Sequence, residues 1–268
     1  MSMKKKLTNK WVLIIFCLIL LGILYIDIQF QTQNMPQSSI VLLNDATVPK
    51  AGQRMLVFSP HPDDETLGAG GLIAEAINNK AEVKIVLITD GNKHGRKDTR
   101  YAEFKKATAM LGVPENNLVY LGYQDGRLNK QNEAKLFQVF KQQIDDYKPD
   151  FVVYPEKADT HPDHATAGRI IGKVMLDENQ SIINYKYLVH YSFFPAHFSY
   201  SPNMFLLPPW RLINNNEAWQ KLMLPTDVEG LKNQAVRVYQ SQIRNHVPFN
   251  ADMMLSPVRK NELFETKN

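Results

Sequence analysis

The sequence predicts an α/β protein with a doubly wound, mostly parallel, Rossmann-like sheet, preceded by an N-terminal transmembrane helix. Three observations lead to this prediction. Short apolar runs alternate with helical patterns from residue 54 onward, the strand-like runs are apolar along nearly their whole length, and a separate apolar run occupies the first thirty residues. Strands without a polar face are typical of parallel sheets that carry helices on both sides.

The N-terminal apolar run, Trp11–Ile26, would cover about 24 Å as a helix, against roughly 30 Å for the hydrocarbon core of a bilayer. Lys10 and Tyr25 at its ends are expected to make up the difference. No small-residue cleavage site follows the run, which favours an anchor over a signal peptide. Because lysines precede the run, we expect a single-pass protein of the cell membrane, with a cytoplasmic tail and anchor at 1–30 and the rest outside.

A mostly polar stretch, residues 31–53, is expected to link the anchor to a domain at 54–268. Residues 195–225 are rich in aromatics and proline and show no clear period, and 228–244 is predicted to form a closing helix. In the first part of this domain, the pattern predicts strands at 55–58, 83–89, 118–121, 151–154 and 187–191. It predicts helices at 67–79, 99–111, 132–147 and 165–176.

Charge and cysteine content exclude some functions. Lysines and one aspartate in the first thirty residues contribute +3 of the net charge of +4, which leaves about +1 for the rest of the chain. We therefore expect no nucleic-acid partner. The single cysteine, Cys17, excludes an intrachain disulfide and a zinc site built on cysteines.

Two histidine motifs each follow an apolar strand. His61–Glu65 has the sequence His-Pro-Asp-Asp-Glu, and His161–His164 has the sequence His-Pro-Asp-His. In each motif proline stands where the next helix is expected to begin. Ligands of open α/β sheets bind at the carboxyl ends of the strands, so the two motifs are expected to converge there.

The spacing within these motifs suits a metal ion. A histidine and a carboxylate three residues apart come to one side of a turn that opens a helix, as His61 and Asp64 would. His164 can add a second nitrogen. Two nitrogens and one oxygen on Zn²⁺ leave the fourth position open, which is the arrangement of catalytic zinc sites. The alternative for one motif alone is a helix N-cap with solvated charges, but two such motifs at strand ends favour the metal.

The remaining motif residues suit acid–base chemistry. Asp63 is expected to point away from the ligand pair and to be free to act as a base. His161, with Asp163 close by, can be oriented as a proton donor or an electrostatic stabiliser.

The chain resembles the PIG-L/LmbE superfamily of zinc-dependent N-acetylglucosaminyl deacetylases. The resemblance rests on residues 59–65 and 161–164 and covers about 54–264. Weaker matches in the same order are Thr89–Gly91, Leu121–Gly126 and the Ser-Gln pair at 241–242.

The resemblance implies a role for each motif residue. Asp63 would be the general base, and His161, oriented by Asp163, would stabilise the oxyanion or protonate the leaving amine. Arg100 and Asp125 match positions that contact the sugar. The implied zinc ligands are those that the spacing already suggests: His61, Asp64 and His164.

The chain also departs from the family pattern. Some members carry a tyrosine shortly before the second motif, where this chain has Ala158–Thr160. Tyr185, Tyr191 and Tyr200 are candidates to replace it. Tyr239 stands where histidine is common in the family.

The predicted function is therefore that of a membrane-anchored, zinc-dependent hydrolase. It would remove the N-acetyl group from an N-acetylglucosamine-type sugar of a cell-surface or lipid-linked glycan. One alternative is a deacetylase of a small GlcNAc conjugate, as in low-molecular-weight thiol synthesis. Another is a non-catalytic glycan-binding protein on the same fold. A metalloprotease is disfavoured because the His-Glu-x-x-His helix is absent from the sequence.

Overall fold

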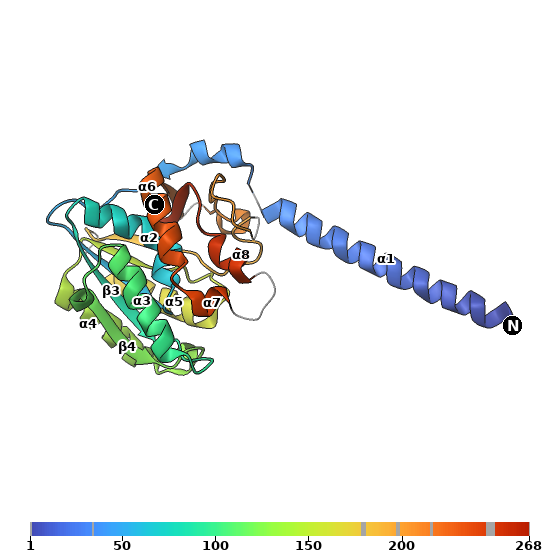
Figure 1. The fold of residues 1–268 in the computed structure, drawn as a ribbon, viewed down its shortest axis with the longest axis horizontal. Helices are drawn as coiled ribbons and strands as arrows, with labels where there is room; N and C mark the ends of the chain where they lie inside the picture. The colour runs from blue at the N-terminus through green and yellow to red at the C-terminus, as the bar shows by residue number, and fades with distance from the viewer. Residues whose placement is uncertain are drawn as a thin grey trace.

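The computed structural model describes residues 2–33, 35–177, 181–196, 199–214, 217–244 and 250–267. These residues form one sheet of eight strands with helices around it (Figure 1). In chain order the strands are β1 (Asn44–Asp45), β2 (Arg54–Ser59), β3 (Glu82–Thr89), β4 (Leu118–Tyr123), β5 (Phe151–Pro155), β6 (Ile183–Tyr187), β7 (Glu217–Met223) and β8 (Asn261–Lys267).

Helices connect most of these strands. The α-helices are α1 (Ser2–Gln33), α2 (Asp64–Asn78), α3 (Lys97–Met110), α4 (Glu133–Tyr147), α5 (Pro162–Asp177), α6 (Thr226–Val236), α7 (Gln240–Ile243) and α8 (Asn250–Leu255). Short 3₁₀ helices are η1 (Gln37–Leu42), η2 (Glu115–Asn117), η3 (Leu128–Lys130) and η4 (Trp210–Leu212).

The sheet is mixed but mostly parallel, in the order β1-β7-β8-β6-β5-β2-β3-β4. β2 pairs in parallel with both β3 and β5, and the parallel pairing continues to β4 and β6. β8 lies antiparallel between β6 and β7, and β1 adds in parallel to β7. The strand order reverses between β2 and β5, and ligands of such sheets bind at the carboxyl ends of the strands beside this switch point.

Helices cover both faces of the sheet because its strands are apolar on both. Met55 and Val57 of β2 belong to a core shared with α2, α3 and α6. Leu56 and Phe58 belong to a second core shared with α4 and α5. Alternate residues of one strand thus enter two cores, as the two-residue period of a strand requires.

The predicted strands and helices between residues 55 and 176 agree with the structure to within a few residues. The strand predicted at 187–191 is instead β6, four residues earlier. β8 was not predicted, because the charged residues in its sequence are not typical of a buried strand. Lys186 of β6 lies 3.7 Å from Glu265 of β8, so both charges are buried together. The closing helix is divided into α6 and α7 around the fully buried Tyr239.

The prediction of a transmembrane helix at 1–30 is wrong. Helix α1 extends away from the body (Figure 1). Among the residues that the structure describes, none belongs to a helix that is both long enough and apolar enough to span a bilayer. The apolar run falls short of the roughly 30 Å hydrocarbon core, and the expectation that its flanks would make up the difference was mistaken. The predicted single-pass localisation in the cell membrane depended on this helix and is therefore also wrong.

Helix α2 is broken at Ala69, whose φ of −145° and ψ of 16° are not helical. A buried ion pair fills the break, with Lys232 Nζ 2.6 Å from a carboxylate oxygen of Glu262. Lys232 donates to the carbonyl of Leu67 at 2.9 Å, and Glu262 accepts from two backbone amides beyond the break at 2.7 and 2.8 Å. The pair satisfies backbone groups that the helix leaves open, and it holds the first turn of α2, which carries Asp64.

We predict that Lys232→Met lowers the free energy of unfolding by about 3–5 kcal/mol, because the substitution leaves the carboxylate of Glu262 buried without its cation. The double variant Lys232→Met/Glu262→Gln should recover part of this loss, since the amide oxygen still accepts a hydrogen bond. Urea unfolding measures all variants. The control is Lys141→Met, which breaks an exposed pair with Asp145 and should cost about 0.5 kcal/mol or less. A cost for Lys232→Met no larger than the control contradicts the prediction.

Candidate functional site

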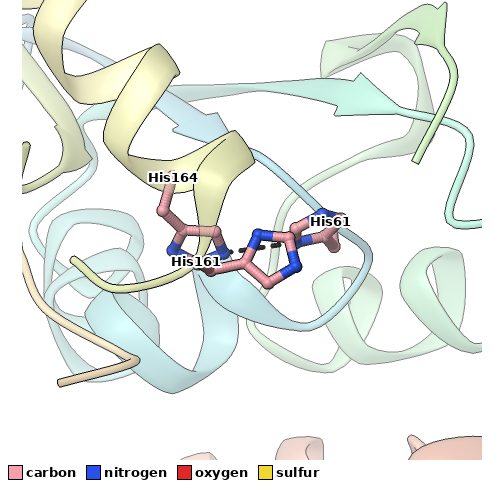
Figure 2. Close-up of side chains that lie close together, drawn as sticks. All are labelled: His61, His161 and His164. Carbon is pink, nitrogen blue, oxygen red and sulfur yellow. Dashed lines mark hydrogen bonds between the residues drawn. The ribbon is translucent and has the colours of Figure 1, made fainter. Parts of the chain in front are cut away.

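The structure brings three donor atoms together at the carboxyl ends of β2 and β5. Nδ1 of His61 and Nε2 of His164 lie 3.2 Å apart, and Oδ2 of Asp64 lies 3.1 Å from the first and 2.9 Å from the second. Figure 2 shows the imidazoles of His61 and His164 facing each other, with His161 beside them. A tetrahedral ion with bonds of about 2.0–2.1 Å has ligand atoms roughly 3.3 Å apart, so this triangle has the size of a metal site.

Each of the two imidazoles in the triangle has a carboxylate next to its other ring nitrogen. Nε2 of His61 lies 3.0 Å from Oδ2 of Asp163 and 3.4 Å from Oδ1 of Asp125. Nδ1 of His164 lies 3.2 Å from Oδ2 of Asp159. This is a close ionic contact, but its geometry is not that of a hydrogen bond. Carboxylates placed in this way fix the tautomer and orientation of metal-binding histidines.

The site carries an excess of buried negative charge. Asp64 is one corner of the triangle, and four other buried carboxylates surround it: Asp63, Asp125, Asp159 and Asp163. Among the described residues, only the guanidinium of Arg100 opposes them with a permanent charge. Burial would lower the pKa of His164, but Asp64 and Asp159 raise it to about 9. The pKa of His61 is likewise raised, against burial, by the carboxylates that contact its ring. The site therefore favours a cation between these rings, and a metal ion fits it.

Asp63 lies beside the triangle but outside it. It caps α2 with a φ of 137°, a left-handed conformation that costs a residue with a side chain roughly 1–3 kcal/mol. Glu65 supports this turn by accepting from the Asp63 amide at 3.3 Å and from the hydroxyl of Tyr239 at 2.5 Å. Burial raises the pKa of Asp63 to about 7, against the opposing charge of Arg100 3.2 Å away. The carboxyl can therefore both accept and return a proton near neutral pH.

Arg100 and Asp125, the expected sugar contacts, lie together in the site at 3.3 Å. Arg100 also donates to the carbonyls of Pro62 and Gly91 at 3.0 and 3.2 Å, which ties the loop after β3 to the first motif. Gly91 has a φ of 61°, and a Cβ there would lie 2.9 Å from the ring of Pro62. A glycine is required at this point of close approach.

His161 lies at the open edge of the site, its ring 4.6 Å from that of His61 between centroids. Burial, with the nearby imidazoles, lowers its pKa to about 4, so the ring is neutral at physiological pH. The backbone amide of Asp163 donates to Nδ1 of His161 at 3.3 Å, but the Asp163 carboxylate does not contact this ring. That carboxylate contacts His61 and accepts from the amides of Gly126 and Leu128 at 2.7 and 2.9 Å.

Asp159 is a site residue that the sequence analysis missed. Its buried carboxylate accepts from the amides of His161, Val189 and His190 at 2.9, 3.1 and 2.9 Å. It thus joins the second motif to the loop after β6. The available clue was its position two residues before His161. Its contacts to Val189 and His190, thirty residues further on, cannot be inferred from a local sequence pattern.

A pocket of about 500 Å³ opens onto the triangle. Its lining includes polar side chains of the site, among them Asp63, Arg100, Asp125 and His161, together with a set of apolar side chains. The apolar side chains are Leu67, Val189, Phe193, Phe194, Pro195, Met253, Met254 and Pro257. A volume of this size falls within the range of small-molecule sites.

Fold and site together define an α/β protein with a candidate metal centre at the switch point of its sheet. Residues 56–175 match the family model described as PIG-L, GlcNAc-PI de-N-acetylase. The match runs from β2 into α5 and includes both histidine motifs. The chain contains a PIG-L family domain.

Curated relatives match the same part of the chain. The probable N-acetyl-alpha-D-glucosaminyl L-malate deacetylase 2 of Bacillus anthracis is 28% identical over 141 residues, which is 47% of this chain and 61% of that protein. The diacetylchitobiose deacetylase of Thermococcus kodakarensis is 26% identical over 128 residues, 43% of this chain and 46% of that protein. The chain thus spans about half to three-fifths of the length of these relatives.

A solved structure supports the fold over a larger part of the chain. It is a triple mutant of a deacetylase involved in the teicoplanin biosynthetic pathway, with a TM-score of 0.60 at 16% identity. The likeness covers 79% of this chain and 97% of that one. At this identity it shows a shared fold.

We predict that Asp159→Asn weakens metal binding about 10–100-fold, because His164 loses the carboxylate behind its Nδ1. Competition with a chromophoric chelator measures the affinity. The control, Asp98→Asn, removes the same charge from the first turn of α3 and should leave the affinity unchanged. Equal affinities of the two variants would show that Asp159 does not support the metal ligand.

Proposed function

We propose that the protein is a zinc-dependent N-deacetylase that removes the acetyl group from a small conjugate of N-acetylglucosamine. The observation that carries the proposal is the triangle of His61, Asp64 and His164, open toward a pocket that also holds Asp63 and His161. Two imidazole nitrogens and one carboxylate oxygen suit zinc and leave a coordination position for chemistry. Zinc would supply polarisation of the acetamide carbonyl and a lowered pKa for water.

The side chains around the triangle account for the proton transfers of amide hydrolysis. Asp63 accepts a proton from the attacking water as the new C–O bond forms. It then returns this proton to the amide nitrogen, so that the C–N bond breaks to give acetate and a free amine. The pKa of about 7 permits both transfers. His161, neutral at this pH, donates a hydrogen bond to the oxyanion that develops on the carbonyl.

Several observations favour a small conjugate as the substrate. The pocket of about 500 Å³ has room for a sugar with a small aglycone. Arg100 and Asp125 in its lining offer a donor and an acceptor for sugar hydroxyls, while the apolar lining residues would contact the rest of the conjugate. The relatives named above include deacetylases of a malate conjugate and of diacetylchitobiose.

The earlier preference for a cell-surface or lipid-linked glycan depended on the N-terminal anchor. Because the anchor prediction is wrong, the small conjugate is the better hypothesis. A non-catalytic glycan-binding role is disfavoured by Asp63. Its strained backbone and raised pKa are features that cluster at catalytic sites.

We predict that the zinc-loaded chain releases acetate from GlcNAc-malate, GlcNAc-inositol and diacetylchitobiose faster than from polymeric envelope glycans. An enzymatic acetate assay measures this, with the metal-free protein as control. Faster release from the polymers would restore the glycan hypothesis. Zinc binding without acetate release from any substrate would contradict the deacetylase assignment.

We predict that Asp63→Asn slows acetate release about 10²–10⁴-fold, since an amide cannot accept the proton of water. Because Asp63 lies outside the triangle, zinc content should stay near one per chain, as atomic absorption would show. The comparison variant, Asp64→Asn, alters a proposed ligand and should lower the zinc content. If Asp63→Asn loses the metal and Asp64→Asn keeps it, the roles of the two aspartates are exchanged.

A further inference from the structure

His190 is an imidazole of the pocket that neither the metal triangle nor the proposed acid–base pair uses. It lies in the loop after β6, and its side chain is 44% exposed toward the pocket. Its ring meets that of His164 edge to face, with centroids 4.7 Å apart, and lies 5.5 Å from that of His161. The two partly exposed imidazoles, His161 and His190, therefore lie next to each other and against the buried one that is proposed to bind the metal.

The distances place His190 within reach of the reacting group. One of its ring nitrogens lies within 4.8 Å of donor atoms of both Asp64 and His164. A ring nitrogen of His161 lies within the same distance of donor atoms of His61 and His164. Another ligand of a tetrahedral ion would stand roughly 3.3 Å from these donors. A hydrogen bond of about 2.8 Å from either outer imidazole can reach an oxygen near that position.

The backbone of His190 is held from both sides by the residues just before His161. Its amide donates to Asp159 at 2.9 Å, and its carbonyl accepts from the amide and hydroxyl of Thr160 at 2.7 and 3.0 Å. Nδ1 of His190 lies 3.6 Å from the second oxygen of Asp159. The segment that positions His161 thus positions His190 as well. Donors that are fixed before the reaction are the ones that stabilise developing charge well.

We propose that His190 donates a hydrogen bond to the oxyanion formed from the acetamide carbonyl, beside the donor that the neighbouring His161 offers. The inference rests on the proposed deacetylase function and adds a catalytic residue to it. Two of the three tyrosines considered as replacements for the family tyrosine have hydroxyl partners elsewhere. The hydroxyl of Tyr185 is bonded to the backbone of Thr47 at 2.8 Å, and that of Tyr200 to Asn233 at 3.0 Å. Of the three candidates, Tyr191 alone lines the pocket.

Kinetics of His190→Leu and His190→Gln test the proposal. Loss of one oxyanion donor should lower kcat about 10²–10³-fold in His190→Leu. KM should change less than about threefold and zinc content should stay at one per chain, because the bond forms only in the transition state. Glutamine keeps an N–H donor, so His190→Gln should retain more activity than His190→Leu. Unchanged kcat in His190→Leu, or loss of zinc together with activity, overturns the proposal.

A binding measurement separates this proposal from the deacetylase function itself. A methylphosphonamidate of glucosamine carries tetrahedral oxygens in place of the acetamide, and its affinity is measured by calorimetry without turnover. His190→Leu should weaken its binding by the same factor as kcat, while the amine product, glucosamine, should bind nearly as before. Equal affinity of the analogue for wild type and His190→Leu overturns the role of His190, even if acetate is released. A large loss in Tyr191→Phe with none in His190→Leu assigns the donor to Tyr191.

Discussion

The clustering of buried carboxylates around two buried imidazoles is the constraint on which the rest of this structure depends. Asp64 lies between His61 and His164, while Asp163 and Asp159 contact the far sides of the two rings. Such a concentration of charge away from water costs several kcal/mol unless cations neutralise it. A metal ion held by the facing nitrogens and Asp64 would offset that cost, and it would supply the carbonyl polarisation that the proposed amide hydrolysis uses.

Three interactions between residues distant in sequence position these groups. The switch point of the sheet brings the ends of β2 and β5 together, and with them the two histidine motifs. The Lys232–Glu262 pair holds the broken start of α2 that carries Asp64. Asp159 then joins the second motif to the loop that carries His190. The proposed metal binding, proton transfer and oxyanion binding would therefore depend on one another through shared side chains.

Much of this arrangement could be predicted from the sequence, because it follows from local patterns. Apolar runs predicted the central strands, and the spacing of His61, Asp64 and His164 suggested the triangle. What failed depended on partners distant in sequence. β8 was hidden because Glu262 and Glu265 are buried against lysines, and His190 carries no motif of its own. The anchor prediction failed for another reason, since an apolar run alone does not ensure a length that crosses a bilayer.

The central claim is that one metal ion occupies the triangle of His61, Asp64 and His164. Crystals grown with zinc, with diffraction measured on both sides of the zinc absorption edge, test it most directly. We predict a single strong anomalous peak bonded to Nδ1 of His61, Oδ2 of Asp64 and Nε2 of His164. Other groups of donors within 4.8 Å of one another occur among the described residues, and one of them is made by His61, Asp125 and Asp163. A zinc peak in that group, with none in the triangle, would contradict the account.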